Sequence, residues 1–530
     1  MIDIMVLEVR NMSYLEIGLL IVFIWILLMI VLRPAINRSQ HFQTMGGILL
    51  LIKVKKNRKI LDRIAGTSKS KLFSRLSVPI VYVLFIMGIS LLVLGTILSL
   101  TVRVKQNIPV TEYLALPGID PEIPIVYGLI AFAISLVIHE MFHGIVARKH
   151  GIKVNSVGLM LFVVPIGAFV EPDEKEITET TPVIRRRIVG AGIAINFVIA
   201  IICFLFLSLA MSHAAVQTYP GAYVDTVCPG SPLLHKNLTE TELISMGNLK
   251  GNDLSTLITN STIVPGTLVT ASFYNGQKII NYTTPAGIQV VSTYKGYPAY
   301  KNISAGDFII SVDNTTIYNE TSLGNVLDRT KPGTDIHVGI ENFSAGLNNP
   351  VISTVSFTTR STYSFYEKVD PAAVTSAMKN ESFIGVGITY SGLGLTTMGY
   401  FKSLVFGSSA YSVGPQGVLQ TIALPFNGLS PVPSGFAHLF TVPMGYTVFW
   451  FSVNTIYWLF WVNILLAITN ALPLAIFDGA QFLRDTLMIA SRRERFKYFR
   501  DEKNIASVLS LTTTIILVLL MIEIVVPRII

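Results

Sequence analysis

The chain has 530 residues, of which 51% are apolar and only 14% are charged. Soluble domains carry about 25% charged residues, so this composition excludes an ordinary soluble protein and indicates an integral membrane protein with a sizeable polar part. The net charge of +8 is modest, and no nucleic-acid partner is expected. The two cysteines, Cys203 and Cys228, are too few for a disulfide framework, and Cys203 lies inside an apolar run.

Six apolar runs are long enough to cross a bilayer, for which a helix needs about 20 residues. The first run is too long for the apolar part of a signal peptide and has no small-residue cleavage site after it, so no cleavable signal is expected. We therefore expect a polytopic α-helical membrane protein with about six transmembrane helices. The runs are residues 14–32, 78–100, 124–147, 189–211, 446–469 and 505–526.

Basic residues predict the orientation of these spans. Residues 33–75 hold eleven Lys/Arg and one acid, residues 484–503 hold a second basic cluster, and further cations follow the third span and precede the fourth. All of these lie on one side if six spans alternate from an external N-terminus. Because cytoplasmic loops carry the excess of Lys and Arg, that side is predicted to be the cytoplasm.

A long polar insert, residues 213–444, separates the fourth and fifth runs and is predicted to be extracytoplasmic and rich in β-strands. Its clearest part alternates strand, turn, helix and strand, with strands at 308–312 and 336–340 and an amphipathic helix at 321–330. The last part of the insert, residues 404–444, is apolar and broken by Gly and Pro, and it is predicted to be a connector on the membrane surface. A gate near the mouth of the cavity is the alternative.

Residues 286–342 resemble a PDZ domain of the permuted kind found in membrane-linked proteases. The stretch that begins at Gly221 resembles the start of a second such unit, in which the expected Gly-Asp turn is blurred. One PDZ-like domain plus an unrelated β subdomain is the alternative. The resemblance implies that the insert can bind a peptide or protein ligand. The motifs are Gly296-x-Pro298-Ala299, Gly306-Asp307 and Pro332-Gly333.

The third apolar run contains the pattern H-E-x-x-H, formed by His139, Glu140 and His143. Residues four apart share one face of a helix, so both imidazoles can bind one Zn²⁺ while Glu140 takes a proton from bound water. Burying three ionisable groups in an apolar span without partners would cost several kcal/mol. The pattern therefore predicts a metal site with one Zn²⁺ per chain.

Zinc in a catalytic site needs a third protein ligand, and Asp478 is the candidate. It follows the fifth run in "NALPLAIFDGAQ", where Asn470 and Pro473 end the helix. The third and fifth runs both cross inward, which brings Asp478 to the depth of the histidines near the cytoplasmic side. An ordinary capping role is the alternative. A downstream Glu ligand is disfavoured, because the first one, Glu494, lies in a basic segment.

The combination of H-E-x-x-H with N-x-x-P-x-x-x-x-D-G resembles the site-2 protease family of intramembrane zinc metalloproteases. "VPIGAFVEPDE" is similar to the family's membrane-inserted hairpin, with Gly167 and Phe169 in its core. "GAGIAINF" is similar to the family's Gly-x-x-x-Asn stretch, here Gly192 to Asn196, although Ile193 stands where the family often has Pro.

This resemblance implies a zinc metalloendopeptidase that hydrolyses peptide bonds in or near the transmembrane helix of a membrane-protein substrate within the lipid bilayer, as in regulated intramembrane proteolysis. Residues 164–170 would either pair with an extended substrate or form a space-filling hairpin. Asn196 and Asn470 would either contact the substrate or the oxyanion, or make interhelical hydrogen bonds.

A membrane scaffold or receptor, with a peptide-binding insert and a structural metal site, is the alternative function. A transporter is a further possibility, but no inverted repeat is visible. The predicted organisation is a first span and basic loop (1–77), a first part of the catalytic core (78–212), the insert (213–400), a connector (401–445) and a second part of the core (446–530).

Overall fold

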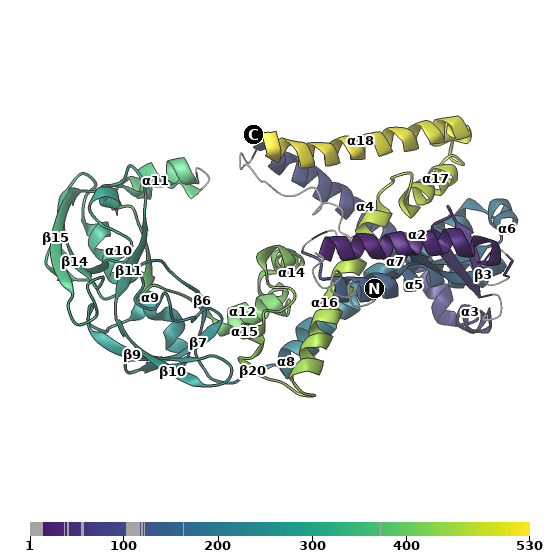
Figure 1. Ribbon diagram of the computed structural model, residues 1–530. Coiled ribbons are helices and arrows are strands. Elements are labelled where there is room, and N and C mark those ends of the chain that lie inside the picture. Colours follow the sequence, from purple (N-terminus) through teal and green to yellow (C-terminus); the bar gives the residue numbers. More distant parts are fainter. Residues whose placement is uncertain are drawn as a thin grey trace. The chain divides into compact units, whose positions relative to one another are not determined.

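The computed structural model describes residues 14–36, 38–39, 42–54, 58–101, 117, 120, 122–162, 164–370 and 373–529. The chain divides into two compact units. The helical unit comprises Met1–Phe206 and Val453–Ile530, and the β unit comprises Leu207–Ser452. Figure 1 labels the elements of both units, which are described separately below.

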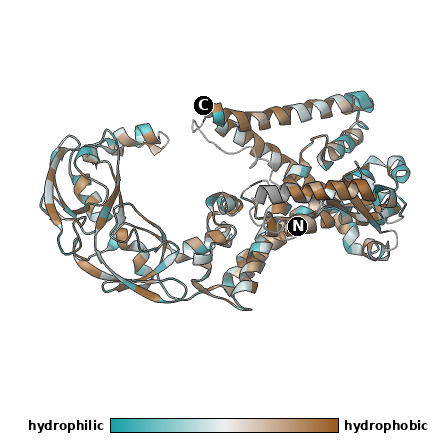
Figure 2. Cartoon of the chain, viewed as in Figure 1, coloured by the Kyte–Doolittle hydropathy of each residue, from teal (hydrophilic) through white to brown (hydrophobic). Residues whose placement is uncertain are grey.

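Five helical stretches in the described part of the chain are long and apolar enough to cross a membrane. They coincide with the second to sixth predicted runs, and Figure 2 colours them mostly as apolar. The first run lies in α2 (Tyr14–Ile36), whose described apolar stretch, Val22–Ile36, is shorter than a span. The described residues thus support five of the six predicted spans. The five are Ser68–Thr101, Ile125–Lys149, Pro182–Ala214, Tyr446–Ala471 and Glu502–Ile529.

Helix α7 (Pro182–Leu205) is the centre of the helical unit and packs against α4 (Ser68–Thr101), α5 (Ile125–Lys149) and α17 (Asp478–Ala490). Its residues 188–196 are all buried, and four of the nine are Gly or Ala, which have no bulky side chain. Small residues let helix backbones approach closely where lipid supplies no hydrophobic driving force. The remaining long helices are α16 (Tyr446–Ala471) and α18 (Glu502–Ile529), and α18 lies alongside α4 (Figure 1).

An antiparallel sheet of four strands completes the helical unit, in the order β1-β2-β3-β4. Its strands are β1 (Phe42–Met45), β2 (Leu49–Val54), β3 (Val154–Phe162) and β4 (Val164–Pro172). Helix α3 (Arg58–Ala65) and helix α6 (Glu174–Glu179) flank it in sequence. Strand β4 ends the sheet and packs against α5, so its outer edge pairs with no other described strand.

The β unit contains a sheet whose two halves repeat one strand order. Along the chain, β6, β7, β8, α9, β9 and β10 are followed by β11, β12, β13, α10, β14 and β15. Read from the edge of the sheet inward, the first half is β10-β9-β7-β6 and the second half is β15-β14-β12-β11. Strands β19 and β18 lie between the halves, where β19 pairs with β6 and β18 pairs with β11. The β unit therefore consists of two halves with the same strand order, although their sequences differ.

The local predictions within the second half agree with the structure. The strand expected at 308–312 is β12, the strand at 336–340 lies within β14, and the helix at 321–330 is α10. Asn319 caps α10 by accepting from the Ser322 backbone N–H, while the Ser322 hydroxyl accepts from that of Asn319. Both cysteines are free thiols.

The elements of the β unit have the following bounds. Its strands are β5 (Val216–Gln217), β6 (Ala222–Val227), β7 (Thr241–Met246), β8 (Leu249–Lys250), β9 (Leu268–Tyr274), β10 (Ile279–Pro285), β11 (Ile288–Thr293), β12 (Phe308–Val312), β13 (Thr315–Thr316), β14 (Asp335–Asn342), β15 (Val351–Thr358), β16 (Arg360–Ser361), β17 (Ser382–Phe383), β18 (Val386–Tyr390), β19 (Leu393–Thr397) and β20 (Phe440–Thr441). Its α-helices are α8 (Ser212–Ala214), α9 (Leu257–Asn260), α10 (Glu320–Arg329), α11 (Thr362–Val369), α12 (Met398–Val405), α13 (Ala410–Val413), α14 (Pro415–Ile422) and α15 (Ser434–Ala437).

Candidate metal centre

One face of α5 carries the two histidines of H-E-x-x-H. The rings of His139 and His143 lie edge to face with centroids 4.7 Å apart, and their Nε2 atoms are 3.1 Å apart. His139 is buried and His143 is nearly so. The helical period places both Nε2 atoms on one side of α5, as the spacing predicts.

Asp478 is the first residue of α17 and meets both histidines. Its Oδ2 atom lies 3.1 Å from Nε2 of His139 and 3.1 Å from Nε2 of His143. The three atoms form a triangle with equal sides, although Asp478 is more than 330 residues away from the histidines in sequence. The structure therefore brings together the three residues for which the sequence predicts metal binding.

The segment before Asp478 turns the chain sharply at the end of α16. The helix ends at Ala471, and the backbone N–H of Leu474 and of Phe477 then bond to carbonyls three or fewer residues back. Gly479 fits against this end, because a Cβ there would lie 2.3 Å from the carbonyl oxygen of Leu472. The Asp-Gly pair thus has a steric cause, since a larger residue after Asp478 would push α17 away from α16.

The three atoms fit a zinc ion. Two ligands of a tetrahedral zinc ion with bonds of about 2.0–2.1 Å lie roughly 3.3–3.4 Å apart. The observed separations of 3.1 Å are close to that value. Two imidazole nitrogens and one carboxylate oxygen are also a usual set of donors for catalytic zinc, which keeps its fourth position for water. His139, Asp478 and His143 would therefore hold the ion.

The far nitrogen of each imidazole has a hydrogen-bond partner on α7. Nδ1 of His143 lies 2.8 Å from the carbonyl oxygen of Ile188, which can only accept. His143 therefore carries its proton on Nδ1 and leaves the lone pair of Nε2 free for a metal. Nδ1 of His139 lies 3.0 Å from Nδ2 of Asn196.

Metal binding by His139 fixes which end of the Asn196 amide faces the ring. A metal on Nε2 leaves the imidazole proton on Nδ1, and this proton needs an oxygen acceptor. Oδ1 of Asn196 is buried and has no hydrogen-bond partner among the described residues. Rotating the amide by a half turn exchanges its two ends and gives both Nδ1 and Oδ1 a partner. Asn196 thus makes a hydrogen bond between α7 and α5, which is one of the two roles that the sequence leaves open.

Gly192 leaves the space in which the imidazoles meet. A Cβ built on it would lie 2.3 Å from Nε2 of His143 and 2.8 Å from Nε2 of His139. No side chain fits between α7 and the ligand atoms at this point. The Gly-x-x-x-Asn stretch therefore combines two contributions on one face of α7, with Gly192 giving room and Asn196 orienting His139.

Glu140 lies next to the three ligands and lines a cavity of about 200 Å³. A carboxylate oxygen of Glu140 and one ring nitrogen each of His139 and His143 all lie within 4.8 Å of one another. A water molecule occupies about 30 Å³ in the liquid, so the cavity has room for water and for part of a substrate. The cavity is lined by Glu140, His143, Val170, Pro172, Ile177, Arg185, Ile188, Val189, Asp478 and Gln481.

Strand β4 supplies one wall of this cavity through Val170. The backbone N–H of Val170 lies 3.4 Å from Oε2 of Glu140, and its side chain packs against Gly144 of α5. Phe169 points to the other side, where its ring covers Gly158 and lies 5.9 Å from Nζ of Lys53. Gly167 pairs with Met160 of β3 in the strand register. Val170 is therefore the member of the predicted hairpin core that lines the cavity.

Arg185 is a cavity residue that the sequence does not single out. Its Nη2 and Nε atoms donate to Oδ1 of Asp485 over 2.7 and 3.0 Å, and both side chains are buried or nearly so. Asp485 lies two turns beyond Asp478 on α17, so this ion pair ties the ligand-bearing helix to α7. No local motif marks the pair, because its partners are 300 residues apart.

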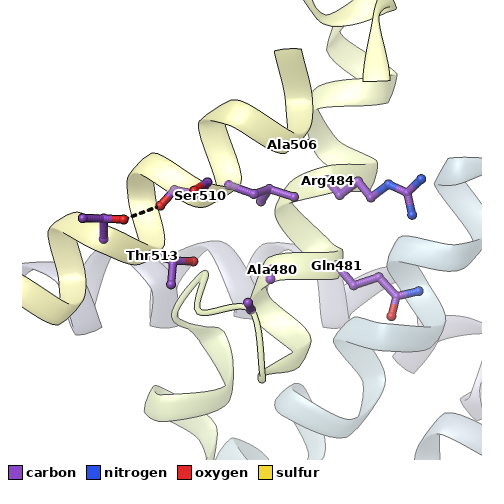
Figure 3. A pocket seen from close by; sticks show the side chains of 9 residues that line it. Ala480, Gln481, Arg484, Ala506, Ser510 and Thr513 are labelled. Carbon is purple, nitrogen blue, oxygen red and sulfur yellow. Dashed lines mark hydrogen bonds between the residues drawn. The ribbon is translucent and has the colours of Figure 1, made fainter. Parts of the chain in front are cut away.

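A second cavity, of about 720 Å³, lies between α17 and α18. Figure 3 shows Gln481 and Arg484 pointing from α17, and Ser510 and Thr513 on α18. Gln481 lines both cavities, so the second one adjoins the metal centre. Asn470 has a partner within its own helix, because its Nδ2 donates to the carbonyl of Leu466 in α16 over 3.0 Å.

The fold and the site define a metal-dependent hydrolase centre held between helices that can cross a membrane. Comparison with known proteins agrees, because the model of peptidase family M50 matches residues 127–517. The chain belongs to this family of membrane zinc metalloproteases, the site-2 protease family.

Two relatives extend the comparison. An uncharacterized protein of Methanocaldococcus jannaschii is 30% identical over 193 residues, which is 36% of this chain and 50% of the relative. A Clostridium perfringens protein, provisionally named a zinc metalloprotease, is 30% identical over 132 residues, which is 20% of this chain and 38% of the relative. The chain thus matches half or less of the length of these relatives.

Proposed function

We propose that this protein is an intramembrane zinc endopeptidase that cleaves membrane-protein substrates in or beside a transmembrane helix, as in regulated intramembrane proteolysis. The observation that carries the proposal is the triangle of His139, His143 and Asp478, which lies on helices of membrane-crossing length with Glu140 beside it. One zinc ion per chain is part of the proposal.

The chemistry follows from where the side chains lie. A zinc ion held by the three ligands would polarise the scissile carbonyl and make its bound water more acidic. Glu140 takes the proton of the attacking water and delivers it to the leaving amine nitrogen. Asn196 keeps the imidazole of His139 in the tautomer that leaves Nε2 free, and the Arg185–Asp485 pair holds α17 in place.

The substrate must be extended before it can be cut, because a helix hides its carbonyls in hydrogen bonds. The unpaired edge of β4 offers backbone groups to which an extended peptide can add as a further strand. Two observations support this placement. Val170 of β4 lines the metal cavity. In the described sheet β4 pairs with β3 along one edge, and its other edge pairs with no described strand.

Sidedness and the β unit belong to the same proposal. In this proposal the metal centre lies near the cytoplasmic side, which the basic clusters favour, α2 makes the sixth span, and the β unit is extracytoplasmic. The repeated strand order supports two PDZ-like units within residues 213–400. These units would sense a peptide or exclude substrates whose external domains are large.

The peptide groove of the second unit would lie near residues 296–300, where Tyr297 packs against α11. The ring of Tyr297 lies 5.4 Å from that of Phe365 on α11, and its hydroxyl donates to the carbonyl of Ser364. Deleting residues 221–390 and bridging the gap with a flexible linker tests the size filter. Unchanged discrimination between substrates with large and small external domains would contradict it.

Replacing Glu140 by Gln tests the proposed reaction. The variant keeps all three ligands and should retain zinc and thermal stability, while cleavage of a membrane-anchored reporter is abolished. Asp478→Ala is the matched variant and should lose zinc and cleavage together. Cleavage by Glu140→Gln at the wild-type rate would refute the role of Glu140. Wild-type protein that binds zinc but cleaves no membrane reporter would favour a scaffold with a structural metal.

A further inference from the structure

A third cavity lies outside the metal centre, in a groove of about 600 Å³ formed by α3, α4, α5 and α7. Its walls are apolar side chains. On α4, Leu72 and Leu76 remain 58% and 47% exposed although they are four residues apart on one helix face. The lining comprises Arg63, Ile64, Thr67, Lys69, Ser70, Leu72, Phe73, Leu76, Phe142, Ile145, Val146, Ile195 and Val198.

The surface of the groove is almost wholly apolar, and the charged residues of its lining gather at one end. Arg63, Thr67 and Lys69 come from the junction of α3 and α4, while Leu76 lies seven residues further along α4, or about 10 Å. Helix α7 contributes Ile195 and Val198 to the apolar lining. A ligand that fills this groove needs an anionic or polar head and a long apolar tail.

The two cations at the polar end are available to such a head. Neither Arg63 nor Lys69 makes an ion pair with another described residue. Asp62, the acid on α3, is already paired with Arg148 through a contact of 2.5 Å. Nζ of Lys149 donates to the carbonyl oxygen of Thr67 and adds a third positive charge beside the groove. The local field therefore favours an anion.

We propose that this groove binds one anionic membrane lipid, with its phosphate on Arg63 and Lys69 and an acyl chain along Leu72, Leu76 and Phe142. A guanidinium group is suited to the oxygens of a phosphate, and basic residues next to a membrane-crossing helix attract anionic lipids. The tail lies against α5 beside the metal ligands, because Phe142 precedes His143. A bound lipid thus braces α5 from its lipid-exposed flank, independently of the proposed proteolysis.

The full chain in a neutral detergent tests this, with native mass spectrometry to count retained lipids and thermal unfolding to measure stabilisation. The probes are phosphatidylglycerol and phosphatidylcholine with the same acyl chains. We expect one phosphatidylglycerol per chain to be retained preferentially and to raise the unfolding temperature. Equal retention of both lipids would mean that an apolar tail alone is recognised, and would overturn the proposal.

Variants locate the site. Arg63→Ala with Lys69→Ala should weaken phosphatidylglycerol binding roughly fivefold per cation removed. Lys71→Ala with Arg75→Ala is the matched control, because it removes equal charge from the same end of α4 but neither residue lines the groove. An equal loss in both double variants would indicate diffuse attraction and refute the site.

A further variant tests the acyl chain without touching the cations. Leu76→Trp fills the exposed part of the groove and should lower retention while zinc content stays unchanged. Glycerophosphoglycerol, which has the head group but no chains, should neither bind nor raise the unfolding temperature. Retention by Leu76→Trp at the wild-type level, or stabilisation by the head group alone, would show that the groove does not hold the tail.

Discussion

Replacing Gly192 by Ala is the sharpest test of the metal centre. The added Cβ would lie 2.3 Å from Nε2 of His143, 2.5 Å from its Cε1 and 2.8 Å from Nε2 of His139. An ordinary contact needs about 3.4 Å, so at least one imidazole must move by roughly 1 Å, whereas zinc–ligand distances tolerate about 0.2 Å. Displacements of this size at a functional site commonly cost about a hundredfold, and we expect zinc affinity to fall by that factor.

Replacing Gly192 by Ala should not destabilise helix α7. Alanine is favoured over glycine inside a helix by up to about 1 kcal/mol, so α7 gains intrinsic stability while the ligands lose their geometry. Gly190→Ala is the matched control on the same helix, because its Cβ would meet Phe482 at 3.3 Å and Val81 at 3.4 Å. Those contacts are tight but involve side chains that can yield by a few tenths of an ångström.

Zinc content per chain, measured by inductively coupled plasma mass spectrometry during competition with a chelator, gives the affinity. Circular dichroism and thermal unfolding establish that each variant is folded. Gly190→Ala should bind zinc as tightly as the wild type, and Gly192→Ala should bind zinc about a hundredfold more weakly. If Gly192→Ala binds zinc as tightly as Gly190→Ala, then the ligand atoms do not converge as argued, and the assigned centre is wrong.

Three further changes have defined outcomes. Asn196→Ala should lower zinc affinity by about 10–100-fold in the same chelator competition, while the fold is kept, because the orienting partner of His139 is lost; unchanged affinity would contradict that role. Asp485→Ala should destabilise the protein by about 3–5 kcal/mol in chemical unfolding, because Arg185 is left nearly buried without its partner; a loss below about 1 kcal/mol would mean that the pair does not brace α17. Burial raises the pKa of Glu242 in the β unit to about 7, although the hydrogen bond that Gln217 donates to this carboxylate partly lowers the pKa. Between pH 4.5, the ordinary pKa of the carboxyl group, and about pH 7, the folded state keeps a proton that the unfolded state has released. The stability of the protein therefore falls as the pH rises through this range, by roughly 3 kcal/mol in total. Glu242→Gln should remove this pH dependence and stabilise the protein most above pH 7, as unfolding at pH 5 and pH 8 would reveal.

Much of the metal centre can be predicted from sequence because helical periodicity is local. The spacing of four from His139 to His143 places both imidazoles on one face whatever surrounds α5. Asp478 is predictable for a weaker reason, since topology brings its span to the same depth but cannot say that its Oδ2 meets both nitrogens. The roles of Asn196 and Asn470 stay open in the sequence, because an amide at membrane depth bonds equally well to a helix, a ligand or a substrate.

The apolar composition and the length of the runs determine that the chain is a membrane protein, and five of the six predicted spans are present as helices of sufficient length. The tertiary structure alone decides that Gly192 makes room for the imidazoles, that Arg185 and Val170 line the cavity, and that the β unit repeats one strand order. The physical reason is distance along the chain. Periodicity fixes which residues share a face, but which faces meet depends on packing between segments hundreds of residues apart.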